Sequence, residues 1–290
     1  MKILTNSILV AGLALFVGSA WSFDFGQELN KALKEGVQKK ISENPGSAAN
    51  VLSGIAGTSQ EEEVAIGRQI AGNLLGATPL IKDKQLQKYV NNVGRWVASQ
   101  SERPDLPWHF GVLESSDINA FAAPGGYIFV TRGLYQQLNS EAALAGVLGH
   151  EIGHVIRQHH LKILQQSSLV DLGGQALSRQ VGGNDKAQQL IGSGAEVVAR
   201  SLDKNAEFEA DSIAVVLATR AGYDSFSFPE VLQDIGHAAK DNSGSVELLF
   251  KTHPHPEERL EKLNVAMGGR MDDVKGLLLD KRFYRLKPLK

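Results

Sequence analysis

Residues 150–154 read His-Glu-Ile-Gly-His, and this pentapeptide constrains both the local fold and the chemistry of the chain. In an α-helix, residues four apart lie on the same face, so His150 and His154 would point in the same direction. Two imidazoles placed in this way can bind one Zn²⁺, and Glu151 can reach a metal-bound water and act as a general base. The alternative is a buried helix with two hydrogen-bonded core histidines.

The residues around the pentapeptide favour a buried helix. It is predicted to begin at Asn139 or Ser140, either of which can cap it, and Glu141 follows where the helix dipole favours a negative charge. Leucine, isoleucine and valine cover most of its circumference, so the polar groups would be stranded in a core unless a metal bound them. We interpret Gly149 and Gly153 as allowing close approach of another backbone or of a substrate.

A catalytic zinc site needs a third protein ligand, and His160 is one candidate. It stands at the spacing of the metzincin pattern H-E-x-x-H-x-x-G-x-x-H, but Arg157 replaces the glycine at which that pattern turns. We therefore expect the helix to continue past Arg157 and to carry His160 away from the metal. His159 and His160 would then be exposed residues at the helix end, near its terminal carbonyl groups.

Glu207 is the stronger candidate for the third ligand. It lies in a second predicted helix, which begins near Asp203 or Asn205 and carries apolar residues along much of its length. Glu207 and Asp211 are four residues apart, so Glu207 can complete a His-His-Glu site while Asp211 accepts the free ring N–H of a ligand histidine. The alternative is a solvated acidic face, which the apolar residues of this helix disfavour.

Three segments together resemble the M48 zinc metallopeptidases, a family of gluzincins that includes soluble bacterial envelope proteases. They are the pentapeptide at residues 150–154, the pair Glu207 and Asp211, and the stretch Asn-Ala-Phe-Ala-Ala-Pro-Gly-Gly-Tyr-Ile-Phe-Val-Thr-Arg-Gly at residues 119–133. Each segment alone is only moderately specific, but their combination indicates the family.

The resemblance runs from about residue 60 to about residue 268. It implies one Zn²⁺ per chain and a mostly helical, zincin-like α+β fold, in which a small antiparallel sheet lies beside the metal-binding helix. It also implies that His253 and Arg259 lie near the active site, where they could stabilise negative charge on the substrate carbonyl. From the residues alone, their segment can equally be a proline-containing loop that caps the next helix.

Short strands are predicted before the pentapeptide. Residues 127–131 form a β-branched and aromatic run after a Pro-Gly-Gly turn, and residues 108–113 alternate well enough to pair with them. Zincins bind peptides by adding them as a strand to a sheet edge beside the metal helix, and Asn119 and Ala120 are candidates for that edge. Asn119 would contact the substrate there, or it is simply a turn residue.

The N-terminus predicts export. Lys2 precedes an apolar run and then small residues, which is typical of a secretory signal peptide over residues 1–22; an uncleaved anchor is the alternative. The chain has no cysteine, which excludes a lipoprotein anchor, and a bacterial periplasm is the expected location. A net charge of -2 gives no reason to expect nucleic acid as a partner.

The rest of the 290 residues divides into an N-terminal helix and linker (23–58), a peptidase domain (59–268) and a basic C-terminal tail (269–290). We expect no tetratricopeptide array. A glycine-rich stretch at 173–194 is predicted to be a mobile lid or a helical pair with a loose turn. Further helices are predicted at residues 25–42, 61–75, 84–101, 226–238 and 257–267.

These features predict a secreted zinc endopeptidase that cleaves unfolded or misassembled envelope proteins. Its partners would be unfolded polypeptides, and the resemblance is compatible with association with the outer-membrane assembly machinery. The rival hypothesis is a non-catalytic, zinc-stabilised chaperone or assembly factor for outer-membrane proteins, which would need the metal but not Glu151. The sequence does not indicate the oligomeric state.

Overall fold

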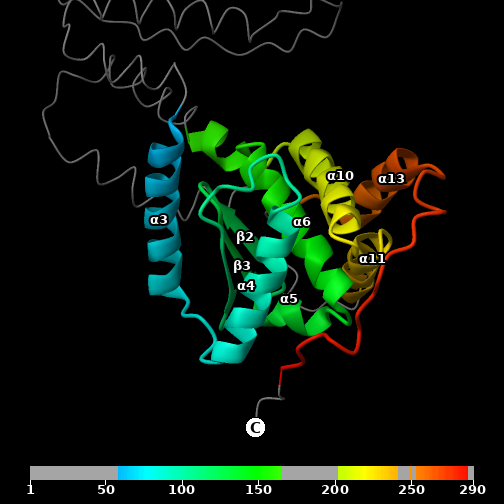
Figure 1. Ribbon diagram of the computed structural model, residues 1–290, viewed down its shortest axis with the longest axis horizontal. Coiled ribbons are helices and arrows are strands. Elements are labelled where there is room, and N and C mark those ends of the chain that lie inside the picture. Colours follow the sequence, from blue (N-terminus) through cyan, green and yellow to red (C-terminus); the bar gives the residue numbers. More distant parts are fainter. Residues whose placement is uncertain (1–57, 165–201, 241–248, 250–252, 287–290) are drawn as a thin grey trace, which may run out of the picture. The chain divides into compact units, whose positions relative to one another are not determined.

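The computed structural model describes residues 58–164, 202–240, 249 and 253–286 (Figure 1). The predicted signal peptide, the helix at 25–42, the linker before Thr58 and the glycine-rich stretch at 173–194 lie outside these residues. Among the residues described, no helix combines the length and the apolar character that a bilayer span requires.

A three-stranded sheet contains β1 (His109–Leu113), β2 (Ala120–Ala123) and β3 (Tyr127–Thr131), in the order β1-β3-β2. The predicted pairing of the first and last strands is confirmed, but the two run parallel, so the sheet is mixed rather than antiparallel. The reason is the path of the chain, which reverses into β2 and then again through a tight turn before β3. Gly125 and Gly126 form that turn with φ values of 72° and 99°, which favour glycine.

Seven helices of the described part have bounds assigned at both ends. Ser59, Asp83, Ser140 and Asp203 cap four of them through side-chain oxygens, and this result selects between the alternative caps considered for the two metal-binding helices. The short helix after β3 was not predicted, and it follows directly from a cap by Thr131. The helices are α3 (Gln60–Ala77), α4 (Lys84–Ala98), α5 (Arg132–Gln137), α6 (Glu141–Ile156), α10 (Lys204–Arg220), α11 (Ser227–Lys240) and α13 (Pro256–Met267).

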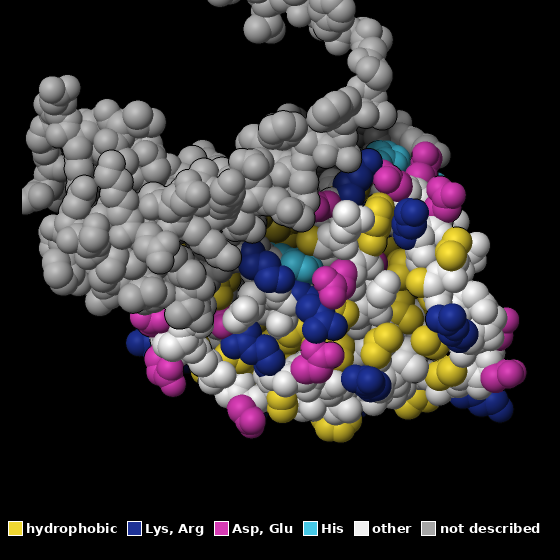
Figure 2. Space-filling model, turned by 90° about the horizontal axis from the view of Figure 1, so that it is seen from above, with side chains coloured by type: hydrophobic (Ala, Val, Ile, Leu, Met, Phe, Trp, Pro, Cys, Tyr) yellow, Lys and Arg dark blue, Asp and Glu magenta, His cyan; other side chains and the backbone are white. Residues whose placement is uncertain are grey.

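Helix α6 lies at the centre of the fold, between the sheet with α4 on one side and α10, α11 and α13 on the other (Figure 1). Every residue from Glu141 to Val155 is buried, as its apolar circumference predicts. A main core joins α4, the sheet and α6, and a smaller core joins α10, α11 and α13. The α+β, mostly helical class is confirmed. Over the face shown in Figure 2, acidic and basic side chains are interspersed with apolar ones.

Two glycines let α6 and α10 pack with their backbones nearly in contact. A Cβ atom at Gly149 would lie 3.1 Å from the Cα of Ala214, and one at Gly153 would lie 3.1 Å from the Cα of Ala210. Of the two interpretations offered for these glycines, the close approach of another backbone is therefore the one that the fold uses. This contact brings the pentapeptide and Glu207 together.

The segment that follows α13 packs against the start of α6. Phe283 is buried in the main core. Arg282 donates from Nε to Glu141 at 2.9 Å, and the hydroxyl of Tyr135 donates to the backbone carbonyl of Tyr284 at 2.6 Å. The first turn of the metal-binding helix is thus held by residues near the end of the described chain.

Replacement of Gly149 by leucine should destabilise the protein by about 1–3 kcal/mol, because the added side chain would push into the backbone of α10. Thermal unfolding would measure the loss. The matched control is Gly72→Leu in α3, where an added Cβ meets nothing within 4 Å. Equal melting temperatures for the two variants would show that α6 and α10 do not need this close contact.

Candidate metal centre

Helix α6 directs two histidine side chains at one point. The Nε2 atoms of His150 and His154 lie 3.0 Å apart, as expected for two imidazoles that face one ion from adjacent turns. Both residues are buried, with 4% and 1% of their surface exposed. Burial lowers the pKa of His154 well below its usual value, so the ring stays neutral, which is the form that binds metals.

Helix α10 supplies a carboxylate opposite these histidines. Oε2 of Glu207 lies 3.6 Å from Nε2 of His150, and Oε1 lies 3.5 Å from Nε2 of His154. Glu207 is fully buried, and neither oxygen has a hydrogen-bond partner within the described residues. Burial raises the pKa of this carboxyl group to about 8. An unpartnered buried carboxylate facing two imidazoles is a site that a cation would complete.

His253 joins the group from the loop before α13. Its Nε2 lies 3.8 Å from a carboxylate oxygen of Glu207. One ligand atom from each of His150, His154, Glu207 and His253 lies within 4.8 Å of the others, so the four side chains could hold one metal ion. His160, the competing third ligand, is not in this group.

A second layer of contacts fixes the orientation of His150. Its Nδ1 lies 2.9 Å from Asp211, so we assign the ring N–H to this contact and Nε2 to the metal side. Arg259 donates two hydrogen bonds to Asp211, at 2.6 and 3.0 Å, and also lies 3.3 Å from Nδ1 of His150. Burial alone would raise the pKa of Asp211, but Arg259 and the hydrogen bonds hold it well below its usual value.

His159 contacts the other ligand histidine, and sequence reasoning missed this role. Its Nδ1 lies 2.9 Å from Nδ1 of His154, and its Nε2 lies 3.3 Å from a carboxylate oxygen of Glu209. If His154 presents Nε2 to a metal, its Nδ1–H donates to His159, and His159 in turn donates to Glu209. The two ligand histidines are therefore each oriented by a carboxylate, one directly and one through a second imidazole.

The prediction that His159 and His160 are exposed is wrong, since each is only 7% exposed. Helix α6 stops at Ile156 instead of continuing, and the chain turns at Gln158, whose φ is 56°. The side-chain amide of Gln158 donates to the buried carboxylate of Glu63 at 3.0 Å, which ties down this left-handed residue. The turn directs both histidines back toward the site.

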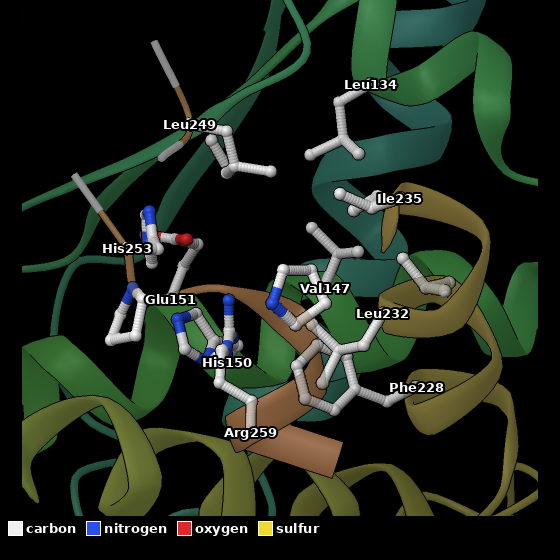
Figure 3. A pocket seen from close by; sticks show the side chains of 14 residues that line it. Leu134, Val147, His150, Glu151, Phe228, Leu232, Ile235, Leu249, His253 and Arg259 are labelled. Carbon is white, nitrogen blue, oxygen red and sulfur yellow. Dashed lines mark hydrogen bonds between the residues drawn. The ribbon is translucent and has the colours of Figure 1, made fainter. Parts of the chain in front are cut away.

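Glu151 lies beside the ligand histidines but outside the four-residue group. It is 3% exposed and lines a cavity next to His150 and His253 (Figure 3). Burial raises the pKa of its carboxyl group to about 8, and Arg259 partly opposes this shift. A carboxyl group with a pKa near neutrality can both accept and release a proton.

Strand β2 brings the candidate substrate-binding residues next to this cavity. β2 is the edge strand of the described sheet, paired only with β3 there, and its residue Ala120 lines the cavity. Asn119 is fully buried, its Oδ1 accepts the backbone N–H of Ala120 at 3.0 Å, and its Nδ2 has no partner within the described residues. A buried amide donor without a partner is uncommon in a native protein.

A comparison with known protein families identifies the family of the chain. Residues 84–266 match Peptidase family M48. This chain belongs to that family. The match includes the pentapeptide, Glu207 and His253, so the M48 resemblance seen in the sequence is confirmed. M48 is a family of zinc metallopeptidases, and four buried side chains of this chain lie close enough together to hold a metal ion.

Several curated M48 proteins align with this chain. It is 32% identical over 209 residues to a protein named beta-barrel assembly-enhancing protease from Escherichia coli (strain K12), covering 69% of this chain and 42% of that protein. It is 27% identical over 188 residues to mitochondrial metalloendopeptidase OMA1 of Arabidopsis thaliana, covering 64% and 37%. It is 27% identical over 195 residues to metalloprotease YcaL of Escherichia coli, covering 67% and 73%. The chain thus spans less than half the length of the first two relatives.

Loss of the Glu207 carboxylate should weaken zinc binding sharply, whereas loss of the His160 ring should not. We expect Glu207→Ala to lower the affinity by more than the roughly 10- to 100-fold typical of losing an outer contact, because a ligand itself is removed. Competition with a chelator of known affinity measures both variants. The reverse ranking would assign the third ligand to His160, as in a metzincin.

Removal of the His159 ring nitrogens should weaken zinc binding by about 10- to 100-fold, since His154 would lose the partner that orients it. His159→Phe keeps an aromatic ring in the same space, and the same chelator competition gives the affinity. His237→Phe, at an exposed histidine of α11, is the control. Unchanged zinc affinity in His159→Phe would mean that this imidazole only fills space.

Proposed function

We propose that this chain is an endopeptidase that cleaves unfolded or misassembled proteins of the bacterial envelope. The observation that carries the proposal is the placement of Glu151, whose buried carboxyl group lies beside the ligand histidines and faces a cavity. The envelope assignment rests on a relative whose name states beta-barrel assembly enhancement and on the predicted signal peptide. By the same reasoning we propose that the chain acts in the periplasm, near the outer-membrane assembly machinery.

In the proposed site His150, His154 and Glu207 hold the metal. A zinc ion held by these residues would supply Lewis-acid chemistry, polarising the scissile carbonyl group and making a water molecule more acidic. Glu151 accepts a proton from the attacking water and then delivers it to the leaving amine. Burial raises the pKa of the Glu151 carboxyl group, which makes its carboxylate a stronger base.

Asp211 and Arg259 influence the metal site through the ligand His150. Asp211 keeps the ring of His150 oriented with Nε2 toward the metal, and Arg259 holds Asp211 ionised and in place. Arg259 also lines the cavity, and we propose that its positive charge favours negative charge on the substrate carbonyl. His253, which lines the same cavity, is proposed for this side of the reaction as well.

We propose that the site recognises its substrate first through the backbone of the substrate peptide. A peptide added to the other edge of β2 would run past Ala120 and the metal centre, with main-chain hydrogen bonds providing affinity. Asn119 could donate its unpartnered Nδ2 to the same peptide. Recognition of this kind suits unfolded chains, because only an extended backbone can be added to a sheet edge.

A non-catalytic chaperone remains the second candidate function. The edge of β2 would also hold an unfolded client without cutting it. This alternative needs the zinc-binding residues for stability but gives no role to a buried carboxyl group beside them. The placement of Glu151 therefore favours the peptidase.

Glu151→Gln should retain zinc and lose activity by about 10²- to 10⁴-fold, because glutamine has the same shape but cannot transfer the proton. The measurement is the cleavage of unfolded casein by the purified protein, with and without a zinc chelator. Zinc content and thermal unfolding of the variant should match the parent protein.

The same variant separates the two candidate functions in cells. Failure of Glu151→Gln to replace the parent protein, with folding intact, supports the peptidase. Full replacement by the variant would favour the chaperone. Casein cleavage at the parental rate by the variant would remove Glu151 from the proposed role of base.

A further inference from the structure

A cavity opens beside Glu151, and polar and apolar side chains line different sides of it. Figure 3 shows His150, Glu151, His253 and Arg259 gathered on one side, with apolar side chains facing them. The apolar wall comes from three helices, α5, α6 and α11, together with Leu249. It consists of Leu134, Val147, Phe228, Val231, Leu232, Ile235 and Leu249.

We propose that this cavity is the specificity pocket of the peptidase and that it binds a large apolar side chain of the substrate residue next to the scissile bond. The inference rests on the proposed peptidase function and names the residue class that the site selects. It assigns to α11 a role that no sequence pattern indicated, since this helix supplies Phe228, Val231, Leu232 and Ile235.

The cavity lies where a side chain of a bound peptide substrate would enter it. Val147 and Glu151 are one turn apart on α6, so the apolar wall and the proposed base share one helix face. Ala120 of β2 lines the same cavity, so a peptide added to that edge passes its mouth. Successive side chains of a strand point to opposite sides, and one of the residues beside the metal would therefore point into the cavity.

The lining also determines which side chains fit. An apolar side chain would exchange water for the wall formed by α11 and Val147, which favours binding. A charged side chain would lose its hydration on entering the cavity. The charged groups at the cavity would not compensate for this loss, because Arg259 is paired with Asp211 and Glu151 is assigned to proton transfer. The pocket should therefore select leucine, methionine or phenylalanine over alanine and over aspartate.

Helix α11 is fixed against α6, which gives the pocket a defined wall. A Cβ atom at Gly146 would lie 2.6 Å from the Cβ of Phe228, so the two helices touch where glycine leaves room. Gly146 precedes His150 by one turn. The wall of the pocket and the metal ligand are thus placed by the same contact.

The test is a set of quenched fluorescent peptides that differ only at the residue flanking the cut, together with mass spectrometry of casein fragments. We expect kcat/KM for phenylalanine or leucine to exceed that for alanine by about 10- to 200-fold, the range that hydrophobic pockets achieve. Ile235→Phe should narrow the pocket and move the preference toward smaller residues, whereas Ile235→Ala should move it toward larger ones. Gln233→Ala, on the exposed side of α11, should keep the parental preference.

The outcomes separate this inference from the proposed function. Absence of chelator-sensitive cleavage by the parent protein would refute the function itself. Cleavage without an apolar preference, or with a preference that neither Ile235 variant moves, would overturn the pocket alone. If Ile235→Phe does not fold, Ile235→Val supplies the comparison with one methylene removed, and the same shift toward larger residues is expected.

Discussion

The close packing of α6 on α10 is the constraint on which the rest of the structure depends. Gly149 and Gly153 remove the side chains that would separate the two helices, and the metal site forms along this contact. The arrangement places the Glu207 carboxylate in a core with no hydrogen-bond partner among the described residues. Without a cation the site combines a costly buried acid with two neutral imidazoles, so the ion and the helix packing stabilise each other.

Much of this site could be predicted from the sequence, because residues four apart in a helix lie on the same face. His150 and His154 are four residues apart, as are Glu207 and Asp211, so the spacing places each pair on one helix face, and the structure brings the two pairs together. Most element types followed from apolar periodicity in the same way, whereas the α+β class was implied by the M48 resemblance. The direction of β1 relative to β3 did not follow from periodicity, because a periodic pattern shows a strand but not the path between strands.

Contacts between distant segments were the part that local patterns could not show. The role of His159 depends on a left-handed residue, Gln158, which glutamine adopts here because Glu63 of α3 accepts its side chain. The apolar pocket is built by α11, whose sequence reads as an ordinary amphipathic helix. In both cases the role of the residues depends on which helices and loops contact one another, and only the tertiary structure shows this.

The contact between Glu141 and Arg282 has a consequence for the order of assembly. The two residues are 141 positions apart, yet Arg282 together with Tyr89 and Tyr223 satisfies a fully buried carboxylate in the first turn of α6. A chain emerging from its N-terminus has the pentapeptide long before it has Arg282. The helix that carries His150 and His154 therefore gains all the partners of its first turn only after nearly all of the domain is available.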